Sequence, residues 1–291
     1  MTTVGIATGA GRGMGLACAQ RLVGMVDVVL LVDRSEPLLL EASKGLSESG
    51  PATVEPLLLD VTDENGLTAL ATRVSELGTL RAVAHAAGIS PTMADWRAIF
   101  TVDLVGTAML VESLRPLVTE GTAIVCFASM AAHLAIKEAD PAVDAALDDP
   151  LDRRFMERVH DAIGPSVEDS GIAYAWAKRG VQRLVRREAV ALGPLGARVC
   201  SISPGIIDTP QGRQEAESHP FMKELVDMTP LGREGRSEEA AALVAFLLSS
   251  EASFVNGIDV LVDGGVCAAI DSRPSNGLFH REIGALDSSD G

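Results

Sequence analysis

The sequence predicts an α/β fold with three layers, in which helices cover both faces of a doubly wound parallel sheet. Three observations predict it. Short apolar runs alternate with longer helical patterns, these runs are largely apolar on both faces, as buried parallel strands are, and a glycine-rich turn directly follows the first run. With 47% hydrophobic and 22% charged residues, the chain of 291 residues can bury one large core.

The alternation predicts seven strands and six helices, which is typical of β-α-β units with right-handed crossovers. The expected strands span residues 4–8, 28–33, 54–60, 82–86, 123–128, 198–203 and 259–262. The expected helices span residues 13–23, 37–48, 64–76, 94–117, 174–192 and 237–248. We interpret residues 1–270 as a single domain.

Two stretches interrupt the alternation. Residues 133–171 are rich in Asp, Glu, Arg and Pro and keep some helical periodicity, so we expect a helical insertion there. The insertion would either wall the substrate pocket or cover a subunit surface. Residues 271–291 are rich in Ser, Gly, Asp and Arg, which predicts a mobile tail or an arm that contacts a partner subunit.

Charge and cysteine content exclude several function classes. The net charge of −16 opposes binding to nucleic acid and to anionic membranes. No CxxC pair occurs, so we expect no metal site but buried thiols in a reducing compartment, at Cys18, Cys126, Cys200 and Cys267. No signal peptide and no apolar run of about 18 residues is visible, which predicts a cytoplasmic protein.

The segment Thr8-Gly9-Ala10-Gly11-Arg12-Gly13-Met14-Gly15 joins the first strand to the first helix. Glycine permits a positive φ and a close backbone approach to a pyrophosphate, which the N–H groups of a helix N-terminus can bind. Asp33 ends the second strand, where its carboxylate can accept hydrogen bonds from the adenine ribose and repel a 2′-phosphate. The pattern predicts a Rossmann-type site for NAD. Arg12 and Arg34 favour NADP, and a structural turn with a surface aspartate is the alternative.

Tyr174 and Lys178 are four residues apart and therefore share one helix face, about 6 Å apart along the axis. A free tyrosine has a pKa of about 10, which a nearby ammonium and an oxidised nicotinamide would lower. Tyr174, the only tyrosine of the chain, could then exchange a proton with an alcohol or a carbonyl oxygen. The same spacing also occurs by chance, so the Tyr174–Lys178 pair indicates an active site only together with the other motifs of the sequence.

That context resembles the short-chain dehydrogenase/reductase family over about residues 2–268. The matching segments are TGAGRGMG (8–15), LDVTD (59–63), HAAG (85–88), FASM around Ser129, YAWAK (174–178), PGIIDT (204–209) and LVDGG (261–265). The insertion and its flanks, SMAAHLAI (129–136) and GIAYAWAK (171–178), look like the bacterial 3α-hydroxysteroid dehydrogenase/carbonyl reductase branch, in which the insertion acts in dimer contact.

The resemblance implies a role for each motif. Ser129 would orient the substrate oxygen, Tyr174 would be the general acid/base, and Lys178 would bind the nicotinamide ribose and tune Tyr174. The implied cofactor contacts are Gly9, Arg12, Gly13, Met14, Gly15, Asp33, Arg34, Asp60, Val61, Ala86, Ala87, Gly88, Tyr174, Lys178, Pro204, Ile207 and Thr209. The expected substrate contacts are Met130, Ala131, Trp176 and Gly205.

Two positions depart from the family pattern. Asp103 stands where the family usually has an asparagine that supports a water-mediated proton relay. An ionised aspartate donates no hydrogen bond, so either the relay is altered or Asp103 is protonated. His85 stands where the family motif has Asn, and we interpret it as a buried, structurally satisfied histidine rather than a catalytic one.

The predicted function is hydride transfer between NAD and a secondary alcohol or ketone, in a homodimer or homotetramer. An apolar lining would suit a hydroxysteroid or another hydrophobic carbonyl compound, although the same residues can be ordinary core: Ala131, Leu134, Trp176, Ile206 and Met222. Residues 219–222 would form either a lid or a plain surface loop. The alternatives are a non-catalytic NAD sensor, which the intact catalytic set disfavours, and a nucleotide-sugar epimerase, which needs a larger C-terminal region.

Overall fold

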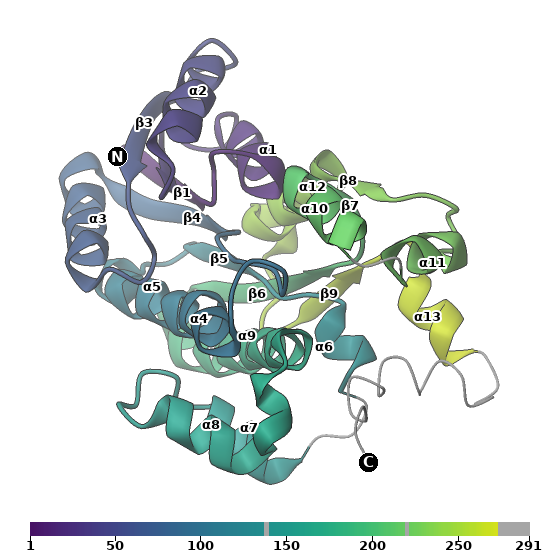
Figure 1. Ribbon diagram of the computed structural model, residues 1–291. Coiled ribbons are helices and arrows are strands. Elements are labelled where there is room, and N and C mark those ends of the chain that lie inside the picture. Colours follow the sequence, from purple (N-terminus) through teal and green to yellow (C-terminus); the bar gives the residue numbers. More distant parts are fainter. Residues whose placement is uncertain (137–139, 219–220, 273–291) are drawn as a thin grey trace, which may run out of the picture.

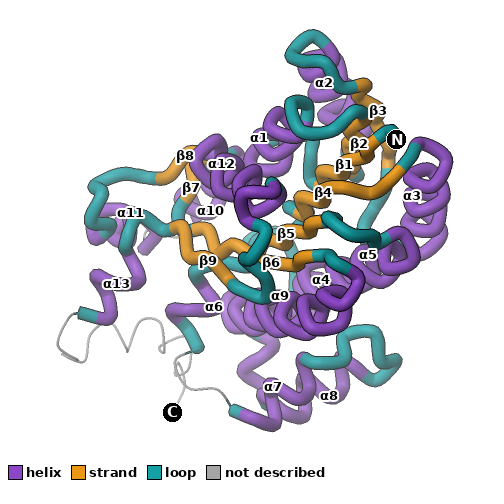
Figure 2. Tube along the Cα trace, turned by 180° about the vertical axis from the view of Figure 1, so that it is seen from behind, coloured by secondary structure: helices purple, strands orange, loops and turns teal. Residues whose placement is uncertain are grey.

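A seven-stranded parallel sheet forms the centre of the protein in a computed structural model that describes residues 1–136, 140–218 and 221–272. The strand order is β3-β2-β1-β4-β5-β6-β9 (Figures 1 and 2). The order reverses between β1 and β4, and in such sheets a ligand binds outside the carboxyl ends of the strands at this point. The predicted doubly wound fold is confirmed. The strands are β1 Thr3–Thr8, β2 Val28–Asp33, β3 Thr53–Leu58, β4 Thr79–His85, β5 Ala123–Phe127, β6 Arg198–Pro204 and β9 Asp259–Val262.

Helices cover both faces of this sheet, and each face has its own apolar core. On one face pack α1 Gly13–Leu22, α2 Glu36–Ser47 and α12 Ser237–Leu248. On the other face pack α3 Glu64–Leu77, α4 Trp96–Phe100, α5 Gly106–Leu114 and α9 Ser170–Leu192. The remaining elements are α6 Ala131–Leu134, α7 Pro141–Leu147, α8 Phe155–Ile163, β7 Ile207–Asp208, α10 Pro210–Ser218, α11 Phe221–Met228, β8 Gly235–Arg236 and α13 Val266–Asp271.

The burial of each strand follows its place in the sheet. The inner strands are buried almost throughout, but β3 and β9 form the two edges of the sheet. In β3, Leu58 is 56% exposed, and all four residues of β9 are only half-buried. The expectation that all the strands are buried on both faces is therefore wrong at the edges, where a strand has a neighbour on one side only.

The helix expected over residues 94–117 is interrupted. Between α4 and α5 the backbone forms a π-helical turn, Thr101–Val105, and α5 ends in a 3₁₀ turn, Arg115–Leu117. A π-helical turn inserts one residue into an α-helix and changes the directions in which its side chains point. Turns of this kind are frequent at functional sites. Here the turn holds Asp103 with its side chain fully buried.

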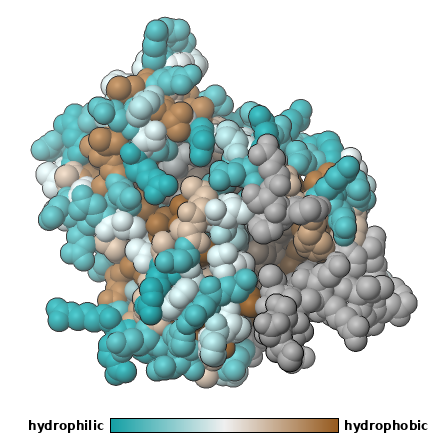
Figure 3. Space-filling view, in the orientation of Figure 1, coloured by the Kyte–Doolittle hydropathy of each residue, from teal (hydrophilic) through white to brown (hydrophobic). Residues whose placement is uncertain are grey.

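The insertion adds α7 and α8 to the outer side of α4 and α9 (Figure 1). The Phe155 ring packs edge-on against Phe100 with their centroids 5.8 Å apart, and Val159 is fully buried in the same core. Among the described residues of the stretch 133–171, only Leu134, Ala135 and Gly171, near its two ends, line the large cavity described below. Its helices therefore cover the core and do not wall the pocket, and their outward side is mostly hydrophilic in Figure 3.

The helix that carries Tyr174 is longer than expected, because α9 begins at Ser170, four residues before Tyr174. Asp169 caps it by accepting a hydrogen bond from the Ile172 N–H, which fixes the start of the helix. Towards the carboxyl end of the chain, α13 follows the last strand. The expected tail falls almost entirely on residues 273–291, outside the described residues.

Candidate active site

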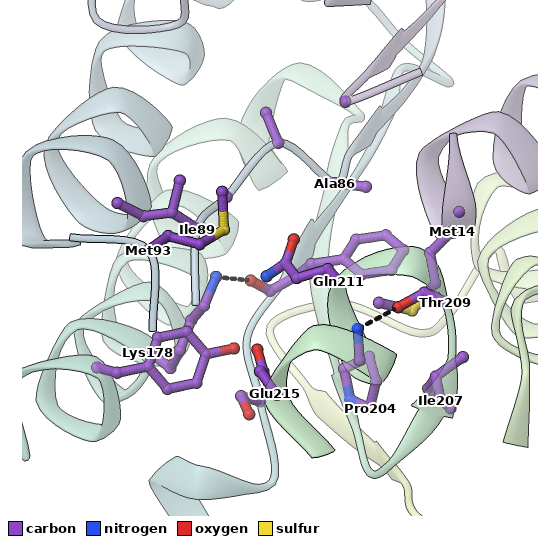
Figure 4. A pocket seen from close by; sticks show the side chains of 18 of the residues that line it. Met14, Ala86, Ile89, Met93, Lys178, Pro204, Ile207, Thr209, Gln211 and Glu215 are labelled. Atoms are coloured by element: carbon purple, nitrogen blue, oxygen red, sulfur yellow. Dashed lines mark hydrogen bonds between the residues drawn. The ribbon is translucent and has the colours of Figure 1, made fainter. Parts of the chain in front are cut away.

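One cavity of about 630 Å³ opens at the carboxyl ends of the central strands (Figure 4). All 17 residues predicted to contact the cofactor line it, although they come from six segments that are far apart in the sequence. This is where the strand order reverses, so the sheet itself brings the segments together.

The glycine turn has the backbone geometry that its sequence predicts. Gly9 and Gly13 have φ angles of 63° and 58°, which residues with a side chain rarely adopt. A Cβ on Gly15 would lie 2.1 Å from the Gly9 carbonyl oxygen, so the start of α1 packs directly on the turn. No side chain caps α1, and its first N–H groups are left for an anion. The turn therefore fits a pyrophosphate.

Two backbone hydrogen bonds orient the carboxylate of Asp33. Oδ2 accepts from the N–H of Gly11 at 2.9 Å, and Oδ1 accepts from the N–H of Ser35 at 2.9 Å. Each oxygen keeps a second acceptor site, which a ribose hydroxyl can use. A Cβ on Gly11 would lie 2.9 Å from Oδ2, a constraint that our sequence analysis missed. Arg12 and Arg34 line the same end of the cavity.

Ser129, Tyr174 and Lys178 converge where β5 ends. Ser129 follows this strand by two residues, and its hydroxyl forms a hydrogen bond with Tyr174. The ammonium of Lys178 donates to the Phe127 carbonyl oxygen at 3.2 Å and lies 5.4 Å from the centroid of the Tyr174 ring. A helix and a strand end thus hold a phenol, a hydroxyl and an ammonium at one point of the cavity wall.

In the chain alone, the surroundings of Tyr174 raise its pKa. Burial raises it above 10, and the carboxylates of Asp103 and Glu215 raise it further, whereas the hydrogen bond from Ser129 lowers it. The expected lowering requires the charge of an oxidised nicotinamide in addition to that of Lys178, and Lys178 is not among the groups that shift this pKa in the chain alone. Lys178 lies 3.7 Å from an Asp103 oxygen, which offsets much of its charge.

Asp103 lies behind Lys178 and does not line the cavity. Its Oδ1 accepts from the N–H of Ile89 at 2.8 Å, while Oδ2 has no hydrogen-bond partner among the described residues and faces the Lys178 ammonium. Burial raises the pKa of Asp103 more than the cation and the N–H lower it. Asp103 can therefore affect the chemistry only through its neighbours.

His85 is buried and has a hydroxyl partner on each ring nitrogen. Nδ1 lies 2.7 Å from the Thr8 hydroxyl, and Nε2 lies 2.9 Å from the Thr107 hydroxyl. Burial, together with the Lys178 charge, lowers the pKa of His85 to about 3. The ring is neutral and holds β1, β4 and α5 together, as expected for a structural histidine.

Three of the four expected substrate contacts, Met130, Ala131 and Gly205, line the cavity, but Trp176 does not. Trp176 is two residues from Tyr174 on α9, so it points about 160° away and packs against the core. The prediction for Trp176 is therefore not supported. The other residues of the expected apolar lining do reach the cavity: Leu134, Ile206 and Met222.

Three polar wall residues were not predicted from the sequence: Ser35 after β2, and Gln211 and Glu215 on α10. Thr209 caps this helix by accepting a hydrogen bond from the N–H of Gly212 at 2.9 Å. A helix starting beside Thr209 puts residues spaced by four on one face, so the spacing from Gln211 to Glu215 was a usable signal.

α11 closes the same side of the cavity through Phe221, Met222 and Leu225. Residues 219–220, also expected in a lid, lie outside the described residues. Within the described ranges, no three metal-ligating side chains cluster, and no helix is long and apolar enough to cross a membrane. All four cysteines are buried, and burial raises the pKa of Cys18 and Cys126 to about 12.

A doubly wound sheet with a pyrophosphate turn, an acid on β2 and a Tyr–Lys pair defines an oxidoreductase that uses a nicotinamide dinucleotide. The comparisons agree. The family model described as enoyl-(acyl carrier protein) reductase matches residues 9–146 and 162–267. The chain belongs to the short-chain dehydrogenase/reductase family.

Three similar proteins illustrate the match. A short-chain dehydrogenase/reductase of Alternaria brassicicola is 32% identical over 92% of this chain and 97% of its own length. Trans-4-hydroxycyclohexanecarboxylate dehydrogenase of Sinomonas cyclohexanicum is 28% identical over 93% of this chain and 95% of its own. The crystal structure of levodione reductase superposes with a TM-score of 0.71 at 29% identity, covering 92% of this chain and 98% of that one.

Proposed function

We propose that this enzyme transfers a hydride between NAD and a secondary alcohol or ketone on a cyclic substrate. One observation carries the proposal: Ser129, Tyr174 and Lys178 converge in the cavity that the glycine turn opens into. The relatives support the substrate class, because their names contain a hydroxylated cyclohexane ring and a dione.

Each side chain of the site has a separate role in the proposed hydride transfer. The bound nicotinamide supplies the hydride acceptor or donor. Ser129 donates a hydrogen bond to the substrate oxygen and orients it, while the phenol oxygen of Tyr174 takes the alcohol proton or returns it to a carbonyl. Lys178 would hold the nicotinamide ribose, and its ammonium would stabilise the phenolate together with the charge of the oxidised cofactor.

A substrate panel tests the reaction. NADH absorbance is followed while the protein is incubated with NAD and cyclohexanol, cyclopentanol, cyclohexane-1,4-diol and a 3α-hydroxysteroid. We expect turnover of the monocyclic alcohols, since the relatives' names favour them over the steroid that the insertion suggested. Tight NAD binding without turnover of any alcohol would favour the sensor.

Asp33 supports NAD over NADP in this proposal. Its carboxylate, held by two backbone N–H groups, would repel a 2′-phosphate. We expect Asp33→Ala to lower the NAD-to-NADP ratio of kcat/KM by at least about tenfold, because Arg12 and Arg34 remain to bind the phosphate. A ratio that does not change would assign cofactor choice to other residues.

We also propose a cytoplasmic homodimer or homotetramer. The support is three exposed apolar side chains in α12 and in the segment that leads from it to the edge strand β9, of which Phe254 is fully exposed. The other two are Phe246 and Ile258. Light scattering measures the particle mass, and a particle of 30.4 kDa would contradict this proposal.

A further inference from the structure

The short helix α6 connects the active site to the outer edge of the sheet. It begins two residues after Ser129, and the N–H of Ala131 donates a hydrogen bond to the Ser129 hydroxyl oxygen at 3.2 Å. That hydroxyl also forms a hydrogen bond with Tyr174. Two residues of α6, Ala131 and Leu134, belong to the cavity wall. The position of α6 therefore affects both the Ser129 hydroxyl and the shape of the cavity.

His133 of α6 binds the edge strand β9. Its Nε2 lies 2.8 Å from Oδ2 of Asp259, the first residue of β9. Two serines of β6 donate to the same carboxylate, Ser201 to Oδ1 at 2.6 Å and Ser203 to Oδ2 at 2.8 Å. Gln182 of α9 donates to Oδ2 at 3.0 Å. One carboxylate thus joins α6, α9, β6 and β9, which lie side by side in Figures 1 and 2.

The Asp259 carboxylate is buried and ionised. Its side chain is 5% exposed, and burial opposes the charge, but hydrogen bonds from His133 and the two serines hold the pKa of Asp259 below 3.8. An ionised carboxylate only accepts hydrogen bonds, so Nε2 of His133 is the donor. The amide nitrogen of Gln182 lies 2.9 Å from the same Nε2, but its two N–H groups are used by Asp259 and Ser203. Among the described residues, His133 is the only ion-pair partner of Asp259.

We propose that His133 is a positioning residue for the reaction, because its bond to Asp259 holds α6 in the place from which the Ser129 hydroxyl is oriented. The orientation passes from α6 through the Ala131 N–H to Ser129, and from there to the phenol of Tyr174. His133 does not line the cavity, so it acts only through these neighbours. The inference deepens the proposed function and rests on it.

Two substitutions of His133 provide the kinetic test. Glutamine keeps a side-chain N–H near the place of Nε2, whereas leucine has a similar size and no donor. We expect His133→Leu to lower kcat/KM for cyclohexanol by about tenfold, through kcat rather than KM, because Ser129 acts on the oxygen whose charge changes in the transition state. The NAD dissociation constant should stay the same. His133→Gln should recover at least about half of the activity.

His160 on α8 is the matched control. It pairs with Glu168 at 3.1 Å, and its side chain is 35% exposed against 36% for His133, but it lies in the insertion and outside the cavity wall. His160→Leu should leave kcat and KM unchanged. A purely structural role of His133 predicts a less stable protein with the original kcat/KM. That result, or an equal loss of kcat/KM in His160→Leu, would overturn the proposal.

A spectroscopic measurement separates this inference from the proposed function. Tyr174 is the only tyrosine of the chain, so protein grown with tyrosine carrying ¹³C at Cζ gives a single tyrosine resonance. Its chemical shift depends on the hydrogen bonds of the phenol oxygen and requires no turnover. We expect Ser129→Ala and His133→Leu to move this resonance in the same direction, whereas His133→Gln and His160→Leu leave it in place.

The two results together distinguish the possible failures. If the resonance moves as expected but no alcohol is oxidised, the proposed function alone fails and His133 still positions the phenol's hydrogen-bond partner. A resonance that His133→Leu does not move contradicts the inference, whatever the activity.

Discussion

Each of the two faces of α9 places a cation beside a carboxylate, but the two pairs differ in hydrogen bonding and in burial. On the outer face, Arg179 binds Asp144 of the insertion through two hydrogen bonds of 2.7 Å. On the inner face, the neighbouring Lys178 lies 3.7 Å from Asp103, and the facing oxygen has no hydrogen-bond partner within the described chain. The outer pair is partly exposed, whereas the inner pair is almost fully buried.

The difference separates structural from chemical use of the same residue types. A bidentate guanidinium–carboxylate pair satisfies both partners and joins the insertion to the core. A buried carboxylate with an unsatisfied oxygen destabilises the fold and requires an explanation, since most buried polar atoms have partners. We infer that the inner pair is kept for its effect on Tyr174, and the following variants test this contrast.

Tyr174→Phe should have the largest effect. Removing the phenol oxygen removes the group that exchanges the substrate proton, so kcat/KM should fall by about 10³-fold, while the NAD dissociation constant stays nearly unchanged. Steady-state kinetics and a fluorescence titration with NAD measure the two quantities. Activity within tenfold of the unmodified protein would remove Tyr174 from its proposed role. Arg179→Gln, on the outer face, is the control and should keep its activity.

Asp103→Asn should have a smaller effect that depends on pH. Burial raises the pKa of Tyr174 first, and the Asp103 charge raises it further, so removing this charge should lower that pKa. Alcohol oxidation needs the phenolate, and its pH profile should therefore shift to lower pH in the variant. Lys178, Glu215 and Ser129 also face Tyr174 and stay the same, so they do not account for the shift. A profile that is unchanged, or shifted to higher pH, would contradict the role of Asp103.

The difference between the two faces of α9 also separates what could be predicted from the sequence from what could not. The glycine turn, Asp33 and the Tyr174–Lys178 pair were predictable because each depends on local rules, namely positive φ, the end of a strand and helical spacing. The 3.7 Å contact of Lys178 with Asp103 was not predictable, because the two residues are far apart in the sequence. The contact also depends on the π turn that sets the direction of the Asp103 side chain.

Errors at the substrate end have the same physical origin. Trp176 was expected in the apolar lining of the pocket, but helix geometry turns it away from Tyr174 and it packs against the core. Glu215 was overlooked although α10 directly follows PGIIDT (204–209), because its spacing from Gln211 indicates only that the two share a helix face, and not that this face packs over the cavity. Contacts between elements distant in sequence require the fold itself.

We expect the smallest effect from changing the pair of Arg179 and Asp144 on the outer face of α9, and this effect should concern only the stability of the protein. Asp144→Asn removes the charge that two arginines of α9 share, and we expect a loss of about 1–3 kcal/mol in the free energy of unfolding with unchanged kcat/KM. Asp148→Asn, at a more exposed partner of Arg183, is the matched control and should lose less than about 1 kcal/mol. Denaturant unfolding measures both.

The pH dependence of that loss identifies its cause. The hydrogen bond from Arg179, opposed by partial burial, lowers the pKa of Asp144 below 3.8. A carboxyl group whose pKa is lowered by folding stabilises the protein above its unfolded pKa and loses this contribution as the pH falls through the folded pKa. The difference between Asp144→Asn and the unmodified protein should therefore be full near neutral pH and shrink below about pH 4. A constant difference down to lower pH would mean that packing, and not the charge pair, attaches the insertion to α9.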